Sequence, residues 1–400
     1  MGAHPAALKT GTVKSRMSQT THLAPKVLIV DLSNHYGGSS SRVLSLMARA
    51  KPGTVALAGL RSGAITRQAI QLGLPVHIVA SHKADPRLLL RIVQIIRRGG
   101  YNVLDSQNIQ SKFWANLAAI ATRTSLVSTL NSWYANEHGK ASMKGRMYTS
   151  LELFTNQSLD LYITVSEKDR QSLLRAGLPE EKVELIYNAV DINTSAIRED
   201  TEWLRKKFHL PPDSIICTAV GRLVPVKGYD VFINAVQKIA SQVPQLVCLI
   251  VGEGECKEEL HKQIRGAGLE NRVHLVGYFD RPDAMSILKS SDIFVMPSRY
   301  EGTPIALLEA AALARPILAS DTGGIPELVQ HEEHALLVPP GDPNGLAQGL
   351  MKLTLDREFA QALGQNARER IQQKFNLESQ VNVTWRAYQK ALDNQLLRKK

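Results

Sequence analysis

The chain has 400 residues, of which 44% are hydrophobic and 21% are charged, the composition of an ordinary globular protein large enough for two or three domains. Its net charge of +11 lies in the first half: residues 1–195 contain 23 Lys and Arg against 12 Asp and Glu, whereas residues 196–400 contain 25 of each. No apolar run reaches the roughly 18 residues that a transmembrane helix needs. Neither a zinc-ligand spacing nor an aromatic RNA-binding motif accompanies the basic half, which disfavours nucleic acid as a partner.

Short apolar runs alternate with helical stretches along most of the chain, the pattern of parallel sheets covered by helices on both faces. Residues 1–25 precede this pattern and lack the apolar core of a secretory signal, so we expect a disordered tail. The strands expected in the first half are 26–32, 54–60, 76–80, 102–107, 125–130 and 161–166. The pattern restarts near residue 215, with strands expected at 214–223, 246–255, 272–279, 293–298 and 316–321.

This repetition predicts an α/β protein of two Rossmann-like domains, residues 26–195 and 196–376, whose parallel sheets face each other across a cleft. Ligands of open α/β sheets bind beyond the carboxyl ends of the strands, where the loops of both domains would gather. The remaining residues, 377–400, are expected to form a helix with a basic end. Trp385 and Tyr388 fall on one face of that helix, which predicts that it docks back on the first domain. The cysteines, Cys217, Cys248 and Cys256, have no metal-ligand spacing and indicate thiols in a reducing compartment.

Glu309 stands in the middle of an apolar run, since residues 300–316 read YEGTPIALLEAAALARP. Thr303 followed by Pro304 marks a helix start, because threonine can cap free N–H groups and proline suits the first turn. A buried carboxylate in the body of that helix needs a polar partner. Either Glu309 pairs with a structural arginine, or it joins Glu301 at the helix mouth, where N–H groups attract anions, in holding a ligand with phosphate and hydroxyl groups.

A cationic loop follows the first strand of the second half, with Gly221-Arg222 and Lys227-Gly228 placed just before a helix start near Tyr229. Two cations five residues apart can neutralise a diphosphate from two sides. Gly37-Gly38 occupy the matching loop of the first half. Glycines there let backbone amides approach a ligand, although an ordinary flexible turn explains them equally well.

Several sequence blocks occur in the order that characterises one enzyme family. They are TVSEKDRQSLLRAGLPEEKVELIYNAVDI (164–192), GRLVPVKG (221–228), the GEG turn (252–254), HLVGY (274–278), EGTPIALLEA (301–310) and ASDTGGIPELV (319–329). The chain thereby resembles the retaining glycosyltransferases of group 1 (family 4), which have the GT-B architecture. Each block alone is a weak signal, whereas all of them in order are highly specific.

The resemblance implies a role for four charged residues. Arg222 and Lys227 would bind the diphosphate of a nucleotide diphosphate sugar, and Glu309 would bind the ribose hydroxyls. Glu301 would hold the transferred sugar and the distal phosphate.

Other donor-binding positions are implied through their backbone. Gly302, Thr303 and Pro304 would assist Glu301, and the loop at Gly277 and Tyr278 would border the base. Gly38 would face the donor phosphate from the first domain, which is expected on the acceptor side.

The sequence departs from the family after the fifth strand, where a histidine is common near the donor sugar. Here Asn131 stands in that place and His138 follows seven residues later. Asn131 can donate and accept hydrogen bonds but cannot act as a base. The catalytic set is therefore expected to be Glu301, Arg222, Lys227 and Asn131, with the choice between Asn131 and His138 open. The family's Asn-Gly-Val-Asp reads Asn-Ala-Val-Asp at 188–191, a structural change only.

No Asp-x-Asp occurs in the chain, which removes the usual metal–diphosphate ligand set. We therefore expect no metal and no cofactor, with cations and helix amides in place of a divalent ion. No clear nucleophile is present either, which agrees with the front-face mechanism proposed for the family. Catalysis would then depend on stabilising leaving-group charge and on positioning in a closed cleft.

We conclude that the sequence is that of a hexosyltransferase-type enzyme that moves a sugar from a nucleotide diphosphate sugar, UDP before GDP, to an acceptor. The acceptor would be a carbohydrate, a lipid-linked glycan or a small molecule, in the assembly of a surface polysaccharide such as lipopolysaccharide or of a glycolipid. Two alternatives remain: a nucleotide-sugar epimerase of the same fold, and a non-catalytic module that binds sugar nucleotides.

The basic first half points to an anionic membrane surface or a lipid-phosphate acceptor, or else to a solvated face without function. Residues 87–101 combine four arginines with an apolar stripe, and Lys140, Lys144 and Arg146 follow in another expected helix. The stripe either meets lipid or, as is usual in such a domain, packs on the sheet. We therefore expect a cytoplasmic protein that contacts the inner face of the membrane peripherally.

Overall fold

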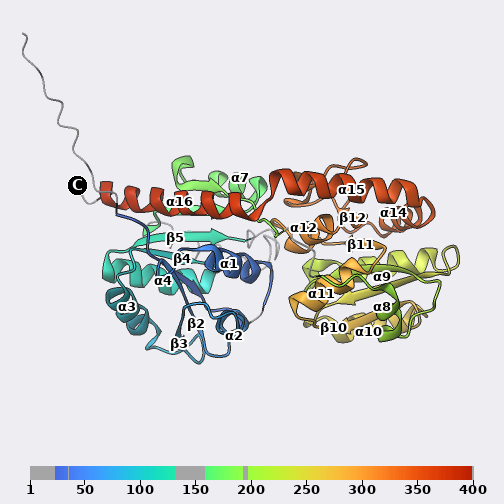
Figure 1. Ribbon diagram of the computed structural model, residues 1–400, viewed down its shortest axis with the longest axis horizontal. Helices are drawn as coiled ribbons and strands as arrows, with labels where there is room; N and C mark the ends of the chain where they lie inside the picture. Colours follow the sequence, from blue (N-terminus) through green and yellow to red (C-terminus); the bar gives the residue numbers. More distant parts are fainter. Residues whose placement is uncertain (1–22, 35, 132–157, 192–196, 399–400) are drawn as a thin grey trace, which may run out of the picture.

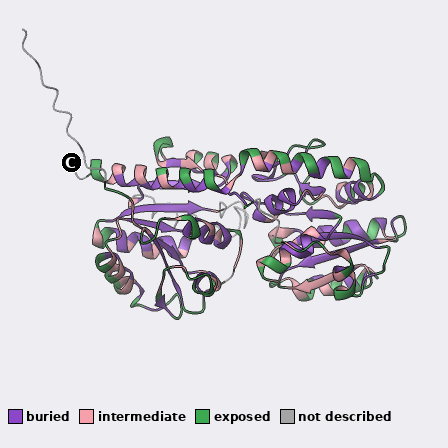
Figure 2. Cartoon of the chain, in the orientation of Figure 1, coloured by how far each residue is buried: buried purple, intermediate pink, exposed green. Residues whose placement is uncertain are grey.

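A computed structural model of the chain describes residues 23–34, 36–131, 158–191 and 197–398, and it places two parallel sheets side by side along the long axis (Figure 1). The central strands of both sheets are buried on both faces, whereas the outer helices carry exposed residues toward solvent (Figure 2). The strands are short and rich in Val, Ile and Leu, which suits parallel sheets covered on both sides. The predicted architecture of two Rossmann-like domains is confirmed.

The first sheet has seven strands in the order β3-β2-β1-β4-β5-β6-β7. The six strands expected from the sequence are present, together with the short edge strand β7. Their bounds are Val27–Asp31 (β1), Val55–Leu60 (β2), Val76–Ala80 (β3), Val103–Ser106 (β4), Ser125–Leu130 (β5), Leu161–Thr164 (β6) and Val183–Leu185 (β7). The helices around it are Gly38–Arg49 (α1), Ala64–Gln71 (α2), Leu88–Gly99 (α3), Ile109–Thr122 (α4) and Glu167–Arg175 (α7), with a 3-10 turn at Glu180–Lys182.

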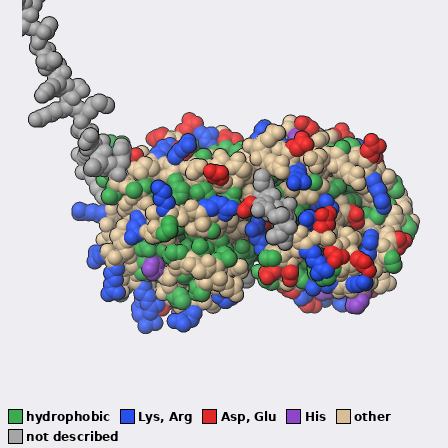
Figure 3. All heavy atoms as spheres, in the orientation of Figure 1, with side chains coloured by type: hydrophobic (Ala, Val, Ile, Leu, Met, Phe, Trp, Pro, Cys, Tyr) green, Lys and Arg blue, Asp and Glu red, His purple; other side chains and the backbone are tan. Residues whose placement is uncertain are grey.

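Helix α3 carries the apolar stripe of residues 87–101, for which the sequence left two interpretations: contact with lipid or packing on the sheet. Its apolar residues Leu88, Ile92 and Ile96 are buried in the core of the first domain. The apolar stripe therefore packs in the core of the first domain, and only the opposite face of α3 is available to a partner. Lys and Arg side chains gather over this edge of the molecule, at the lower left of Figure 3. Lys140, Lys144 and Arg146 lie outside the described residues.

The second sheet has six strands in the order β10-β9-β8-β11-β12-β13. All five expected strands are present, again with one extra short edge strand. Their bounds are Ile215–Val220 (β8), Leu246–Val251 (β9), Val273–Gly277 (β10), Ile293–Met296 (β11), Ile317–Ser320 (β12) and Leu336–Val338 (β13). The helices are Thr201–Phe208 (α8), Tyr229–Ile239 (α9), Lys257–Gly266 (α10), Arg281–Lys289 (α11), Ile305–Ala312 (α12), Ile325–Leu328 (α13), Pro343–Leu355 (α14) and Arg357–Lys374 (α15), with a 3-10 turn at Pro225–Lys227.

The last helix, α16 (Leu377–Arg398), follows α15 but leaves the second domain and lies over the first (Figure 1). It packs against β4, β5 and β6, and Tyr388 donates a 2.7 Å hydrogen bond to the buried carboxylate of Asp105 on β4. Trp385 and Tyr388 meet edge to face. The predicted docking of this helix on the first domain is confirmed. Within the described residues, no helix combines the length and apolar character needed to cross a bilayer.

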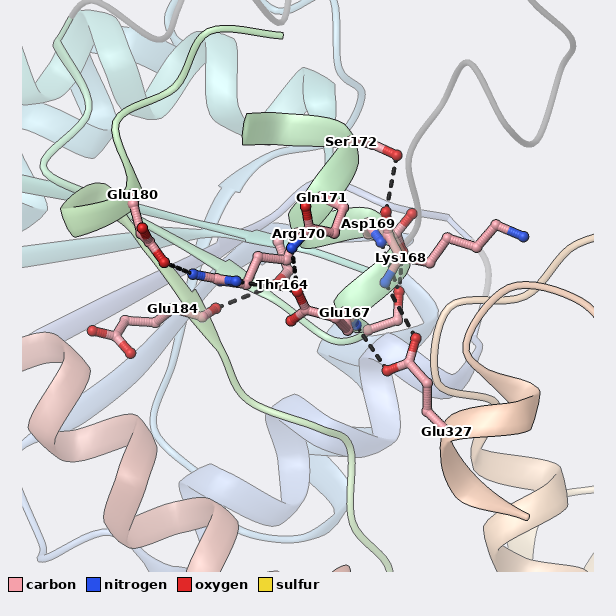
Figure 4. A network of polar contacts seen from close by, with 11 residues as sticks. Thr164, Glu167, Lys168, Asp169, Arg170, Gln171, Ser172, Glu180, Glu184 and Glu327 are labelled. Atoms are coloured by element: carbon pink, nitrogen blue, oxygen red, sulfur yellow. Dashed lines mark hydrogen bonds and ion pairs between the residues drawn. The ribbon is translucent and has the colours of Figure 1, made fainter. Parts of the chain in front are cut away.

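A carboxylate from the second domain binds the start of a first-domain helix. Glu327 on α13 accepts hydrogen bonds from the backbone N–H groups of Glu167 (2.8 Å) and Lys168 (3.2 Å) in the first turn of α7 (Figure 4). Unpaired N–H groups and the helix dipole make this position favourable for an anion. The contact joins the second domain to the first.

Candidate functional site

Loops from both sheets meet where the sequence analysis placed its site residues. A Cβ atom at Gly302 would lie 2.3 Å from the carbonyl oxygen of Asn131, and one at Gly38 would lie 3.1 Å from Cγ1 of Ile305. Asn131 follows β5 and Gly38 begins α1 in the first domain, whereas Gly302 and Ile305 belong to the start of α12 in the second. Glycine is thus needed at 302 so that the two backbones can approach this closely.

The cationic loop after β8 lies at this junction. Lys227 ends a 3-10 turn, and Gly228 follows with φ +67°. A Cβ atom at Gly228 would lie 2.1 Å from the carbonyl oxygen of Pro297, so only glycine fits here. That conformation turns the chain into α9 and directs Lys227 toward Glu301, whose Oε1 lies 2.6 Å from the lysine Nζ. The structure thus brings together two of the residues that the sequence assigned to the site, through an ion pair that was not predicted.

Glu301 has two partners in this structure. Its Oε1 accepts hydrogen bonds from Lys227 and from the hydroxyl of Ser298 (2.7 Å), which follows β11. Burial raises the pKa of Tyr229, and the charge of Glu301 adds to the rise while that of Arg222 opposes it. Arg222 and Glu301 therefore both lie within electrostatic range of Tyr229. The Arg222 side chain is exposed, and the described part of the chain supplies it with no side-chain hydrogen bond.

Glu309 is buried one turn into α12, and its Oε1 accepts a 2.7 Å hydrogen bond from Nε of Arg281, the first residue of α11. Burial raises the pKa of Glu309, and Arg281 opposes that rise. Of the two interpretations of Glu309, the pairing with an arginine is what the structure shows. The Arg281 side chain is 37% exposed, so it can yield this place to a ligand.

Tyr36 lies within electrostatic range of Tyr278 and of the Arg281–Glu309 pair. Burial raises the pKa of Tyr36, with Arg281 lowering it and both Glu309 and Tyr278 raising it. Tyr278 follows β10 and is 59% exposed, next to Gly277 at φ +82°. Tyr36 and Arg281 were missed by the sequence analysis. The position of Tyr36 beside Gly37-Gly38 was the available signal for it, while no pattern distinguished Arg281 from other surface arginines.

The Thr303 hydroxyl does not cap α12, contrary to the sequence prediction. It donates instead to the carbonyl oxygen of Val165, just beyond β6, while Pro304 is the N-cap residue. The carbonyl of Thr303 in turn accepts a 2.8 Å hydrogen bond from the Asn188 side chain. Both contacts cross between the domains, so the helix cap was lost to tertiary hydrogen bonding. The N–H groups of the first turn of α12 consequently keep no side-chain cap.

Asn131 is held by a hydrogen bond from its Nδ2 to the carbonyl oxygen of Gln107 (3.1 Å). This bond fixes the orientation of the amide, and its Oδ1 is buried with no hydrogen-bond partner among the described residues. A buried acceptor of this kind is normally satisfied, so it marks a place for a ligand donor. His138, the alternative to Asn131, lies outside the described residues.

Comparison with known proteins supports the same assignment across the chain. Residues 200–370 match the family described as glycosyl transferases group 1, and residues 44–194 match glycosyltransferase family 4. An Escherichia coli UDP-Gal:alpha-D-GlcNAc-diphosphoundecaprenol alpha-1,3-galactosyltransferase is 28% identical over 304 residues, which cover 74% of this chain and 78% of that protein. A GDP-mannose-dependent alpha-(1-6)-phosphatidylinositol monomannoside mannosyltransferase of Mycobacterium tuberculosis is 31% identical over 52% of this chain and 56% of its own length.

Solved structures agree on the fold. The crystal structure of Anabaena HepE in complex with UDP-glucose superposes with a TM-score of 0.79 at 24% identity, covering 90% of this chain and 98% of that one. With both halves matched in order, and with the carboxylates, the cationic loop and the close glycine contacts at one junction, the chain belongs to the group 1 (family 4) glycosyltransferases of the GT-B fold.

Proposed function

We propose that this glycosyltransferase is a metal-independent, retaining enzyme that transfers a hexose from a UDP-sugar to an acceptor in surface polysaccharide or glycolipid assembly. The second domain would bind the donor and the first would bind the acceptor. The observation that carries the proposal is the Lys227–Glu301 pair, 2.6 Å apart, beside the uncapped start of α12. It supplies a cation, a carboxylate and free N–H groups within one small region.

The donor would lie across this region with its diphosphate between the loop of Arg222 and Lys227 and the first turn of α12. Cations and helix N–H groups stabilise a diphosphate without a divalent ion. Glu309 would exchange Arg281 for the ribose hydroxyls. UDP is favoured as the carrier because the galactosyltransferase relative uses UDP-Gal and HepE was solved with UDP-glucose.

The transfer would break the bond between the anomeric carbon and the diphosphate oxygen, whose electron pair leaves with the nucleoside diphosphate. The acceptor hydroxyl forms the new bond on the same face of the sugar, and its proton passes to the departing diphosphate oxygen. Lys227 and Arg222 would stabilise the charge that grows there, which is the largest contribution such a site can make. Glu301 and Asn131 would hold the sugar hydroxyls.

The exposed face of α3 is the place for a peripheral membrane contact, because Arg87, Arg97 and Arg98 lie on it together with Leu90. Cations near an anionic surface each contribute about 1 kcal/mol, and the attraction falls with salt. Such a contact would bring a lipid-linked acceptor to the cytoplasmic side of the membrane.

The direct test mixes the purified chain with radiolabelled UDP-glucose, UDP-galactose and GDP-mannose, each with a membrane extract that supplies acceptors. The expected result is saturable transfer from a UDP-sugar to an extractable product whose anomeric configuration, read by NMR, matches that of the donor. Interconversion of UDP-sugars without acceptor would instead indicate an epimerase. Inverted configuration would overturn the retaining mechanism alone.

A further inference from the structure

A pocket of about 310 Å³ opens at the edge of the first sheet, away from the proposed donor site. Its walls are formed by the residue after β2, by the end of β3 and the residue after it, and by the start of α3 with the loop that leads to it: Arg61, Ile78, Ala80, Ser81, Asp85, Arg87 and Arg91. Three arginines and a single carboxylate line it. The pocket therefore carries an excess of two positive charges, which is the charge that a phosphate group balances.

Asp85 organises two of the arginines. Its Oδ1 accepts from the backbone N–H of Arg87 (2.9 Å) and from its Nε (3.1 Å), and its Oδ2 accepts from Nη1 of Arg91 (3.1 Å). Hydrogen bonds from Arg87 lower the pKa of Asp85 to about 2, so the carboxylate stays ionised at neutral pH. Arg91 also donates to the carbonyl oxygen of Val79 at 2.7 Å. Both guanidinium groups are thus held at the rim before any ligand arrives.

Arg61 differs from the other two because its side chain makes no ion pair or hydrogen bond with the described residues. It stands directly after β2, and its backbone N–H donates to the carbonyl oxygen of Ala80 at 2.8 Å. This backbone contact fixes the base of the side chain at the pocket while the guanidinium stays available. A guanidinium presents its donors in a planar fork that suits phosphate oxygens.

Apolar surface adjoins the cationic pocket. Ile78 lines it and is 42% exposed, and Leu90, in the same helical turn as Arg87 and Arg91, is 64% exposed. An exposed isoleucine and leucine beside a cationic pocket suit a ligand that carries both a phosphate and a hydrocarbon chain.

The position of the pocket relates it to the donor site. It lies at the carboxyl end of β2 and β3, and β3 is two strands from β1, a separation of about 10 Å. The loop after β2 also packs on the loop after β1, since a Cβ atom at Gly63 would lie 3.1 Å from the carbonyl oxygen of Ser33. The loop after β1 leads to Gly37-Gly38, where the first domain faces α12.

We infer that this pocket binds the phosphate of an amphiphilic acceptor, with Arg61, Arg87 and Arg91 as its ligands and with Ile78 and Leu90 against the hydrocarbon chain. The inference rests on the proposed function in one respect, that the ligand is called an acceptor. Binding of the ligand to the pocket does not require sugar transfer. The same phosphate chemistry is offered by a soluble sugar phosphate and by a lipid phosphate, which the experiment separates.

The experiment measures the affinity of the full chain for hexyl phosphate and for inorganic phosphate by calorimetry, in solution without membranes. Arg61→Gln removes the cation whose side chain makes no ion pair or hydrogen bond among the described residues, and Arg97→Gln removes a cation on the exposed face of α3 outside the pocket. We expect Arg61→Gln to weaken hexyl phosphate binding about tenfold, as the loss of a charge-assisted contact should, and Arg97→Gln to leave it unchanged. Equal losses in both variants, or none in Arg61→Gln, would overturn the pocket.

The two sources of phosphate are separated by the hydrocarbon chain. If the ligand is a lipid phosphate, hexyl phosphate binds more tightly than inorganic phosphate, and Leu90→Ser removes that difference without changing the affinity for inorganic phosphate. If the two phosphates bind equally well, the inference of an amphiphilic ligand is wrong, and the pocket binds a soluble phosphate compound instead. UDP affinity is measured on the same samples: UDP binding without phosphate binding overturns this inference alone, and phosphate binding without UDP binding overturns the donor site alone.

Discussion

Arg281, the first residue of α11, donates a 2.7 Å hydrogen bond from Nε to the carboxylate of Glu309 in the body of α12. The pair joins two helices of the second domain at the place where the resemblance to the family expects ribose hydroxyls. Because Glu309 is buried and Arg281 is partly exposed, the arginine is the member that can move when a ligand enters.

Replacing Glu309 by Gln tests which role dominates. If the carboxylate accepts two ribose hydrogen bonds, nucleotide affinity should weaken by roughly 1–3 kcal/mol while the fold survives. Arg281→Gln is the matched control, because it breaks the same ion pair from the other side and leaves the carboxylate in place. Titration calorimetry with UDP measures both variants. If the two lower the thermal unfolding temperature alike and neither changes UDP affinity, Glu309 is only a structural partner of Arg281.

The second prediction concerns the diphosphate. Lys227→Ala and Arg222→Ala should each reduce transfer on the order of a hundredfold, mainly in kcat, because their contacts strengthen as leaving-group charge develops. Lys257→Ala is a suitable control, since Lys257 pairs with Glu253 on the surface of the same domain. Initial rates at saturating donor concentration measure kcat for each variant. Near-normal kcat in both Lys227→Ala and Arg222→Ala would show that the diphosphate binds elsewhere.

Metal independence is the third prediction. Transfer should continue undiminished in excess EDTA, because Lys227, Arg222 and the start of α12 supply the positive charge that the diphosphate needs. The assay uses protein dialysed against chelator and compares rates before and after magnesium or manganese is added. Activity that vanishes with chelator and returns with either ion contradicts the proposed site.

The pH dependence of the free energy of unfolding should reveal the titration of Asp105, which is buried under α16 beside Arg42. Burial raises its pKa from 3.8 to about 6, with Tyr388 and other hydrogen-bond donors opposing the rise. The folded state therefore holds this proton more tightly than the unfolded state, so the contribution of Asp105 to stability is greatest below about pH 4 and is lost as the pH rises to about 6. The loss is about 3 kcal/mol for a shift of this size.

Urea unfolding of wild type and Asp105→Asn at matched pH isolates this effect, because other titrating groups cancel in the difference. Wild type should lose free energy of unfolding relative to Asp105→Asn between about pH 4 and pH 7. Tyr388→Phe removes a donor to the carboxylate and should move the loss to higher pH. A difference between wild type and Asp105→Asn that does not vary with pH would show that Asp105 titrates normally.

Vesicle binding tests the exposed face of α3. The chain should co-sediment with anionic vesicles at low salt and release at high salt, while neutral vesicles should bind poorly. Replacing Arg97 and Arg98 together by Gln should reduce the binding without changing UDP affinity. Equal binding to both vesicle types, or none to either, leaves the basic face as solvated surface.

The strands were predictable from sequence wherever both faces are buried, because continuous runs such as VLIVD at 27–31 have no competing interpretation. Strands β7 and β13 were missed since each has only three residues at a sheet edge, too short to show any period. The grouping of Lys227 with Glu301 was foreseeable because their motifs follow the carboxyl ends of adjacent strands β8 and β11.

Side-chain partners that come from other elements were not foreseeable. Thr303 has the local sequence of a helix cap, yet its hydroxyl binds Val165, 138 residues earlier, and local propensity gives way to a tertiary contact. Arg281 is likewise one of many arginines, and only the packing of α11 on α12 brings it to Glu309. Such pairings depend on how elements meet, which no single-sequence pattern records.

The path of α16 has a consequence for synthesis. Residues of α16 such as Val381, Tyr388 and Leu392 complete a hydrophobic core built otherwise from the first half of the chain, including Val27, Val43 and Leu57. Proteins commonly fold domain by domain as the N-terminal part leaves the ribosome. Here the first sheet is covered by a helix that is translated only after the whole second domain. The nascent first domain therefore exposes an apolar face until α16 has left the ribosome, by which time the second domain has already been translated.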